Sequence, residues 1–396
     1  MDQIRTFKLE ELEESMKLSQ FAFQIEPDPQ TLEARRSRLK PEELWGYFVN
    51  GRLASQLRLL QLSIWLNGER FEMGGIASVA TWPEYRRQGQ VGKLLRHSLN
   101  VMKERGMTVS MLHPFSFAFY RKYGWEMTVE QKVCAMNAGQ LPRLPEPSGH
   151  MERLEDPAQA WQLLDQIYSA FAPRYNGMLV RNEEWWKREL AMRWSGTAAV
   201  YYDGNGRPAG YVIYEVKKRE LKVKDWAAVN RDALFGIWKL IANHDSMADR
   251  YEWTTALDDP FTMLLHDPRI EQRIVPYFMG RIVDVQPFLQ RFRFQPAEHS
   301  EVLSLQVKDD EASWNDGIYR LEVDAHGCVT DIDKIEENVN AENLIICDIQ
   351  ALTSMMFGCR RPRALHAFDK ISGSEDAVLR WEARLPQLTS YLADFF

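Results

Sequence analysis

Hydrophobic residues follow a strand pattern through the first part of the chain, and two hairpin turns interrupt it. Asn50-Gly51 and Asn67-Gly68 each lie between segments rich in Val, Leu, Ile and aromatic residues. Asn-Gly in this setting is the strongest short signal for a β-hairpin. Residues 44–81 are therefore predicted to form a meander of strands.

The hydrophobic spacing changes from strand to helix after Thr81. Gly106 is placed to end this predicted helix. A strand at 108–112, a short helix at 117–122 and another strand from Trp125 would complete an α/β unit. The apolar residues at helical spacing are Val91, Leu94, Leu95, Leu99 and Met102.

A similar order of elements follows a proline-rich segment. Residues 141–149 carry three prolines and end in Gly149, so they are predicted to be a linker. Beyond it, residues 151–195 have a helical pattern, 198–214 form a hairpin and 221–227 form a strand. An amphipathic helix follows, in which Leu234, Ile237, Trp238 and Ile241 share a face. This repetition indicates an internal duplication. The second copy is expected to have lost its chemistry, because no basic glycine-containing turn precedes its helix.

From about Arg281 the chain changes to short alternating strands, at 302–307, 318–323 and 344–347. A helix at 349–357 and a last helix ending near Leu392 are expected to pack against them. The predicted fold class is α/β and α+β, with tandem mixed sheets flanked by helices and then a smaller α+β domain. The predicted boundaries are 1–145, 146–280 and 281–396.

Composition restricts the class of protein further. The 396 residues carry a net charge of -7, which disfavours a nucleic-acid partner. No apolar run has the length of a membrane span, and the N-terminus lacks a signal-peptide pattern, so a cytoplasmic protein without a membrane partner is expected. The four cysteines lie far apart without nearby histidines, which favours buried free thiols and no metal site.

The strongest chemical signal is residues 78–99, which combine a β-branched strand, a basic glycine-containing turn and an amphipathic helix. A helix N-terminus presents unpaired N–H groups and a partial positive charge, so it binds pyrophosphate readily. Gly89 and Gly92 would let the backbone approach phosphate, and Arg87 adds charge. Alternatively, a glycine-containing turn simply joins a strand to a helix.

This stretch resembles motif A of the Gcn5-related N-acetyltransferases, although a second small residue is more usual at Val91. The resemblance implies acetyl-CoA as the acetyl donor. It also implies that Val79, Ala80 and Thr81 contact the pantetheine arm. The residues implied to surround the pyrophosphate are Arg87, Gln88, Gly89, Gln90, Val91 and Gly92.

Residues 115–126 add a second signal, because "FYRKYGWE" resembles the later part of the acetyltransferase fold. There a helix carries a tyrosine that faces the thioester. Tyr120 is therefore predicted to protonate the coenzyme A thiolate; alternatively, it packs in the core. Tyr123 is expected to be a packing residue. Phe115 and Ser116 are predicted to contact the cofactor.

The whole chain resembles the enhanced intracellular survival type of acetyltransferase. That resemblance implies an active acetyltransferase domain (1–145), a degenerate copy (146–280) and a domain similar to sterol carrier proteins (281–396). It also implies a homohexamer, with the C-terminal carboxylate, here on Phe396, as general base. The expected acceptors are small cationic amines such as aminoglycosides, polyamines or lysine side chains.

Two questions stay open at this point. The apolar end of the chain could dock at the active site or merely cap the third domain, and Glu26, Asp28 and Asp394 could attract a cation or simply be solvated. The alternative function is a non-catalytic protein that binds an apolar ligand in the sterol carrier-like domain. The helix with Leu352 and Met355 would then line a tunnel, although it fits a closed core equally well.

Overall fold

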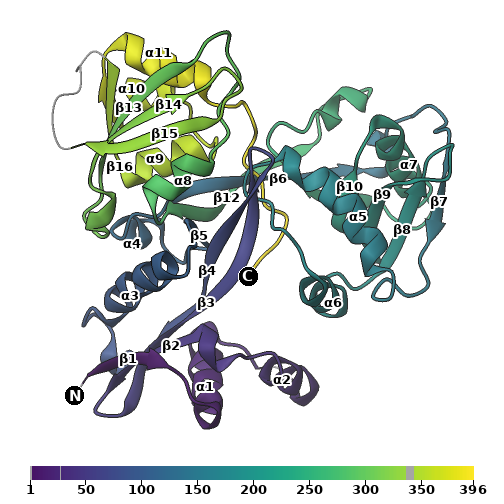
Figure 1. The fold of residues 1–396 in the computed structure, drawn as a ribbon. Coiled ribbons are helices and arrows are strands. Elements are labelled where there is room, and N and C mark those ends of the chain that lie inside the picture. Colours follow the sequence, from purple (N-terminus) through teal and green to yellow (C-terminus); the bar gives the residue numbers. More distant parts are fainter. Residues whose placement is uncertain (1, 27, 336–342) are drawn as a thin grey trace.

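The computed structural model of the protein describes residues 2–26, 28–335 and 343–396. Two α/β units and a smaller α+β unit follow one another along the chain. In Figure 1 the middle unit (teal) and the C-terminal unit (green to yellow) lie on different sides of the central strands. In the described part of the chain, no helix has the length and hydrophobicity of a membrane span.

The first unit contains both predicted hairpins. Asn50-Gly51 and Asn67-Gly68 have positive φ angles at both residues, as a tight two-residue hairpin turn requires. Its strands are β1 (Gln3–Thr6), β2 (Leu44–Val49), β3 (Arg52–Leu66), β4 (Glu69–Thr81), β5 (Val109–Leu112) and β6 (Glu126–Asn137). Its helices are α1 (Leu12–Phe23), α2 (Pro29–Arg36), α3 (Gln90–Glu104) and α4 (Phe117–Arg121).

The second unit begins after the predicted linker, which contains no helix or strand. The continuous helical pattern expected for 151–195 is wrong in part, because the segment begins as a strand and Pro157, Pro173 and Gly177 interrupt the remainder. The strands are β7 (His150–Arg153), β8 (Thr197–Tyr202), β9 (Pro208–Lys217), β10 (Glu220–Ala228) and β11 (Arg250–Thr255). The helices are α5 (Trp161–Phe171), α6 (Glu183–Met192) and α7 (Arg231–Ala242).

The two units share one 12-stranded sheet among the described residues. Its order is β1-β2-β3-β4-β5-β12-β6-β11-β10-β9-β8-β7. The strand β12 (Glu271–Ile282) pairs antiparallel with β5 on one side and with β6 on the other. The last strand of the second unit therefore completes the sheet of the first unit.

The third unit has a five-stranded sheet in the order β15-β14-β13-β16-β17. Its last helix ends at Arg384 and not near Leu392, because Pro386 cannot continue the hydrogen-bond ladder. The strands are β13 (Glu301–Lys308), β14 (Gly317–Val323), β15 (Val329–Ile335), β16 (Leu344–Asp348) and β17 (Ile371–Gly373). The helices are α8 (Val285–Arg291), α9 (Ile349–Met356), α10 (Pro362–Ala367) and α11 (Glu375–Arg384).

Residues 385–396, called the tail below, leave the third unit and run back between the other two. The Tyr391 N–H donates to the Asn176 carbonyl at 2.9 Å, and the Gln131 side chain donates to the Leu392 carbonyl at 2.8 Å. Leu392 is fully buried. The C-terminus ends beside β3 and β4 (Figure 1), so the tail is part of the folded interior and does not merely cap the third unit.

Candidate functional site

Strands β4 and β5 part in the middle of the first unit. Their parallel pairing runs from Met73–Val109 to Ile76–Leu112, whereas β4 continues to Thr81. The last five residues of β4 therefore have no partner on the β5 side. An extended amide chain such as pantetheine could pair with backbone groups there, which fits the prediction for Val79, Ala80 and Thr81.

A β-bulge changes the direction of β4 at this point. The pairing with β3 shifts between Gln56 and Arg58, which leaves two β4 residues opposite one residue of β3. Ser78, in the bulge, has a φ of 52°, a value that residues other than Gly, Asn and Asp rarely adopt. Such strain commonly occurs where function requires a particular backbone direction. Here it orients the backbone of Val79, the next residue.

The basic turn lies at the exposed N-terminus of α3. Gly89 is the N-cap with a φ of 84°, and it has no side chain that could accept from the first-turn N–H groups. The first turn of α3 contains no acidic residue. Gln88 donates to the Glu84 carbonyl at 3.0 Å, and Gln90 donates to Gln88 at 3.1 Å, which orders the turn. These features fit a bound pyrophosphate, since free N–H groups and a positive helix end face solvent.

Gly92 has a packing role that the sequence did not reveal. A Cβ added there would lie 2.3 Å from the Tyr123 hydroxyl oxygen, so glycine makes room for this ring. Tyr123 also packs against Phe119, with ring centroids 5.3 Å apart. The predicted packing role of Tyr123 is confirmed. Through this contact α3, which carries the basic turn, is fixed against α4.

Helix α4 carries Tyr120, which is 2% exposed and lies in the same hydrophobic cluster as Val79 and Val91. Burial raises the pKa of the Tyr120 phenol, so the hydroxyl stays protonated at neutral pH. Phe115 is exposed, with its ring 5.2 Å from that of Tyr120. Ser116 is the N-cap of α4 and accepts from the Phe119 N–H at 3.3 Å, so its hydroxyl already has a structural partner.

His113 was not predicted from the sequence, although a polar residue directly after the predicted strand 108–112 was a signal for it. It follows the last paired residue of β5. Its ring lies 4.9 Å from Phe395 and 5.5 Å from Tyr277, centroid to centroid. Burial lowers its pKa, which favours the neutral imidazole. His113 therefore links the point where the strands part to the tail.

Phe396 lies at the same point. Its ring packs on Phe278 of β12, with centroids 4.9 Å apart. A Cβ added at Gly75 of β4 would lie 2.9 Å from Phe396 Cε2, so glycine leaves space for this ring. The structure thus brings the C-terminal residue beside β4, one residue before its pairing with β5 ends.

Asp394 does not face solvent or a substrate cavity, which corrects the expectation that it could attract a cation. Its carboxylate accepts from Arg181 Nε at 3.1 Å and from Trp185 Nε1 at 2.8 Å. Arg181 also pairs with Asp225 at 2.7 Å. Burial lowers the pKa of Arg181, but the two carboxylates outweigh burial and leave it well above its ordinary value. This buried cluster fastens the tail to the second unit.

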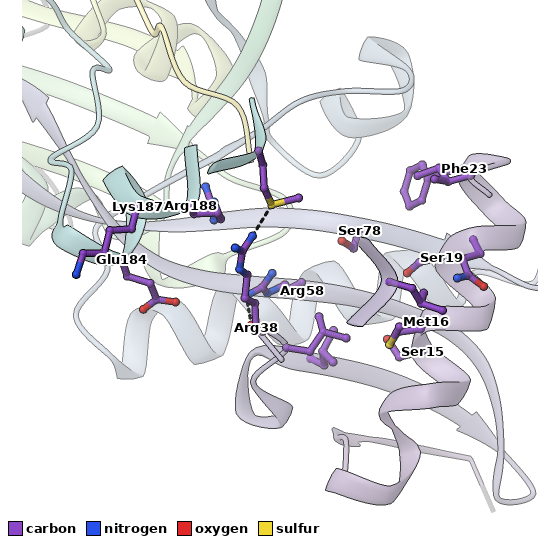
Figure 2. Close-up of a pocket in the computed structure, with 16 residues that line it drawn as sticks. Ser15, Met16, Ser19, Phe23, Arg38, Arg58, Ser78, Glu184, Lys187 and Arg188 are labelled. Atoms are coloured by element: carbon purple, nitrogen blue, oxygen red, sulfur yellow. Dashed lines mark hydrogen bonds between the residues drawn. The ribbon is translucent and has the colours of Figure 1, made fainter. Parts of the chain in front are cut away.

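A cavity of about 490 Å³ opens beside the bulge of β4, and we call it the α1–α6 cavity. Ser78 lines it. Figure 2 shows Glu184, Lys187 and Arg188 of α6 at one end, Ser15 and Met16 of α1 at the other, and Arg38 and Arg58 between them. Its volume is in the range of small-molecule sites.

The third unit offers little support for a tunnel. Leu352, Met355, Met356 and Phe357 are all buried in one continuous core shared with the first unit. A second cavity, of about 530 Å³, lies between the first and third units, and its lining includes charged side chains. Those charged residues are Arg121, Glu126, Asp348, Arg360 and Lys370.

Three family models match successive parts of the chain. Two describe an acetyltransferase (GNAT) domain and match residues 3–128 and 177–282. The third describes a sterol carrier protein domain and matches residues 285–393.

Individual proteins are similar over long stretches. An uncharacterized N-acetyltransferase of Streptomyces griseus is 26% identical over 67% of this chain and 69% of its own length. A crystal structure of a probable N-acyltransferase from Enterococcus faecalis has 27% identity and a TM-score of 0.92, covering 100% of both chains. The structure of Eis1 from Mycobacterium abscessus has 20% identity and a TM-score of 0.83, also covering both chains completely, and shows the same fold.

Proposed function

This chain is an acyltransferase of the Gcn5-related N-acetyltransferase superfamily, and we propose that it transfers an acetyl group from acetyl-CoA to a primary amine. The observation that carries the proposal is the uncapped N-terminus of α3 beside the free end of β4. Such a helix end suits pyrophosphate, and the free strand edge suits the pantetheine amides. The residues proposed to bind acetyl-CoA are Val79, Ala80, Thr81, Arg87, Gln88, Gly89, Gln90, Val91, Gly92, Phe115 and Ser116.

The proposed reaction is a direct attack. The amine nitrogen attacks the thioester carbonyl carbon, so a C–N bond forms and the C–S bond breaks. The Phe396 carboxylate takes the proton that the amine loses, and Tyr120 gives its proton to the leaving thiolate. The Val79 N–H donates to the carbonyl oxygen as negative charge develops there, a contribution of a few kcal/mol, roughly. The raised pKa of Tyr120 keeps its phenol protonated at neutral pH, so the proton that it would donate is present.

The test follows thiol release from acetyl-CoA with a panel of amines, for the untagged wild type and for a chain without Phe396. We expect amine-dependent release in the wild type and its loss in the shortened chain. Calorimetric binding of coenzyme A to both chains is the control, because a folded, shortened chain should still bind it. Failure of the wild type to bind coenzyme A and to release thiol with any amine would refute the proposal.

Two further features are proposed from the family resemblance alone. The protein assembles as a homo-oligomer, specifically a hexamer, and it works in the cytoplasm. Light scattering on the purified protein measures the molecular mass of the assembly. A mass equal to that of a single chain would refute the proposed homo-oligomer. The described cysteines are all free, which agrees with a reducing compartment.

A further inference from the structure

The α1–α6 cavity is the part of the site that faces the acceptor, if acetyl transfer occurs as proposed above. It begins at Ser78, next to the Val79 N–H. Its α6 wall leads to the tail, because Arg188 stacks on Trp185 at 3.8 Å and the Trp185 ring lies 6.5 Å from that of Phe396. A molecule in this cavity would therefore lie between the proposed oxyanion donor and the proposed base.

The charges that line this cavity are mostly positive. Four cationic side chains line it, and Glu184 is the one carboxylate among the lining residues. Three of the cations have acidic partners outside the cavity lining, and Glu184 has a basic one. These pairs are Arg58–Glu43 at 2.6 Å, Lys187–Glu183 at 2.5 Å, Arg188–Glu189 at 2.8 Å and Lys40–Glu184 at 3.0 Å.

Arg38 is the exception. Its guanidinium contacts the sulfur of Met192 and has no carboxylate partner among the described residues. It is only partly exposed, and the second cation Arg58 lies directly beside it, with Nη2 3.4 Å from the Arg38 carbonyl oxygen. An arginine without a counter-ion, held between two domains in a cavity, is an anion-binding group, because its planar fork matches carboxylate and phosphate oxygens.

Most of the remaining wall is apolar, and its polar members are Ser15, Ser19, Gln20 and Ser78. Met16, Phe23 and Leu39 line the cavity, together with Met192 beside Arg38. The cavity therefore combines a backbone donor beside Ser78, apolar side chains and the cation Arg38. We propose that the acceptor is a small amine that also carries a carboxylate or phosphate group, which binds Arg38 while the amine faces Val79.

This substrate class differs from polyamines and aminoglycosides. Those molecules carry several positive charges, and one of these charges would meet Arg38 without compensation. A zwitterionic acceptor instead neutralises Arg38 and keeps its amine free for transfer. Binding and charge discrimination would then come from the same residue.

The experiment compares matched pairs of amines that differ in the anionic group. One pair is 6-aminohexanoate and 6-aminohexanamide; the other is tyramine O-phosphate and tyramine. Binding of each is measured by calorimetry on the protein saturated with coenzyme A, and KM is measured by thiol release. Hydrogen bonds to charged groups are worth about 1.5–3 kcal/mol, so in at least one pair the anionic member should bind about 10-fold to 100-fold more tightly. A preference within the first pair would identify carboxylate as the bound group, and a preference within the second would identify phosphate.

Arg38→Gln should reduce this preference to about threefold or less, with an unchanged KM for acetyl-CoA. The matched control is Arg36→Gln, an exposed arginine two residues away that does not line the cavity, and it should keep the full preference. Equal or weaker binding of both anionic members would overturn the proposal, as would a preference that survives in Arg38→Gln. Failure of the wild type to bind coenzyme A would instead count against acetyl transfer itself. Failure of the acceptor proposal and failure of the proposed function are therefore distinguishable.

Discussion

The two acetyltransferase units have the same order of elements, but the N-termini of their equivalent helices, α3 and α7, differ in capping and charge. In the first, β4 and β5 are parallel and joined through α3; in the second, β10 and β11 are parallel and joined through α7. The N-terminus of α3 is uncapped and faces solvent. In α7, Asn230 accepts from the Ala233 N–H at 2.8 Å, and Asp232 places a carboxylate in the first turn. A phosphate there would meet a capped helix end with a carboxylate in its first turn, next to Arg231.

In the second unit, side chains occupy part of the space between the strands, beside a cavity of about 300 Å³ that Arg174, Trp226 and Asn230 line. Trp226 of β10 donates to the Thr254 carbonyl of β11 at 3.2 Å. Arg174 donates to the carbonyls of Ala228, at 3.2 Å, and of Val229. The chain's own side chains thus satisfy carbonyl groups at this end of the strands. We propose that the second unit binds no cofactor for this reason, while it keeps a structural task, the binding of the tail.

The largest loss of activity is expected from a change at Tyr120 of α4. In the second unit, the short helix after β11 (Phe261–Leu264) contains no tyrosine. Tyr120→Phe should lower kcat by about 10²–10⁴-fold, the usual contribution of a general acid, with little change in the KM for acetyl-CoA. Steady-state kinetics at saturating amine measure this. Tyr123→Phe is the control and should stay within about threefold of wild type. Full activity of Tyr120→Phe would remove it from the role.

The next largest effect, on stability, is expected in the buried ion cluster that fastens the tail to the second unit. Asp394→Ala leaves Arg181 with one carboxylate and should cost about 3–5 kcal/mol in urea unfolding, because it breaks a buried ion cluster. kcat should fall with it, because Phe396 loses its position. Asp310→Ala removes an exposed pair with Lys308 and should cost less than about 1 kcal/mol. Equal stability of the two variants would show that the cluster does not fasten the tail.

Gly89→Asp gives α3 the kind of charged N-terminus that α7 has. The carboxylate would accept from the first-turn N–H groups and repel pyrophosphate. We expect the dissociation constant for coenzyme A to rise by about 100-fold, roughly 2.7 kcal/mol, in calorimetry. Gly51→Asp, at another exposed glycine of positive φ but far from the turn, should leave it unchanged. Tight binding by Gly89→Asp would place the pyrophosphate elsewhere.

His113 is expected to make the stability of the docked tail, and with it kcat/KM, depend on pH. Its pKa is lowered by burial, so the neutral ring is present at pH 7. Protonation would put a charge against Phe395, Tyr277 and Phe278, and the docked tail should lose stability as pH falls below the ordinary histidine value of about 6.5. kcat/KM is expected to fall there by up to tenfold per pH unit. His113→Gln should flatten this limb; an unchanged profile would assign it to another group.

The smallest effect is expected at the cap of α7. Asn230→Ala removes the hydrogen bond to the Ala233 N–H and should cost about 1 kcal/mol in urea unfolding. Coenzyme A binding should not change, because this helix end takes no part in it. A change in that affinity would show that the second unit retains a cofactor site.

Local patterns predicted most of the elements and named the candidate residues of the basic turn and Tyr120. The Asn-Gly turns and the start of α3 depend on neighbouring residues, so their spacing was sufficient to place them. The position of β12, the burial of Asp394 and the contact of His113 with Phe395 depend on segments far apart in the sequence. No local periodicity records such contacts. The unpaired charge of Arg38 was equally hidden, because the partners of its neighbours come from other elements.

The insertion of β12 between β5 and β6 has a consequence for synthesis on the ribosome. The first unit emerges early, but the strand that completes its sheet emerges only at the end of the second unit. Until then the inner edges of β5 and β6 have unpaired backbone groups beside buried side chains, which is a known hazard for aggregation. The two units must therefore mature together. A gene fragment cut at the linker would encode an unfinished sheet, and the N-terminal acetyltransferase unit is not a portable module.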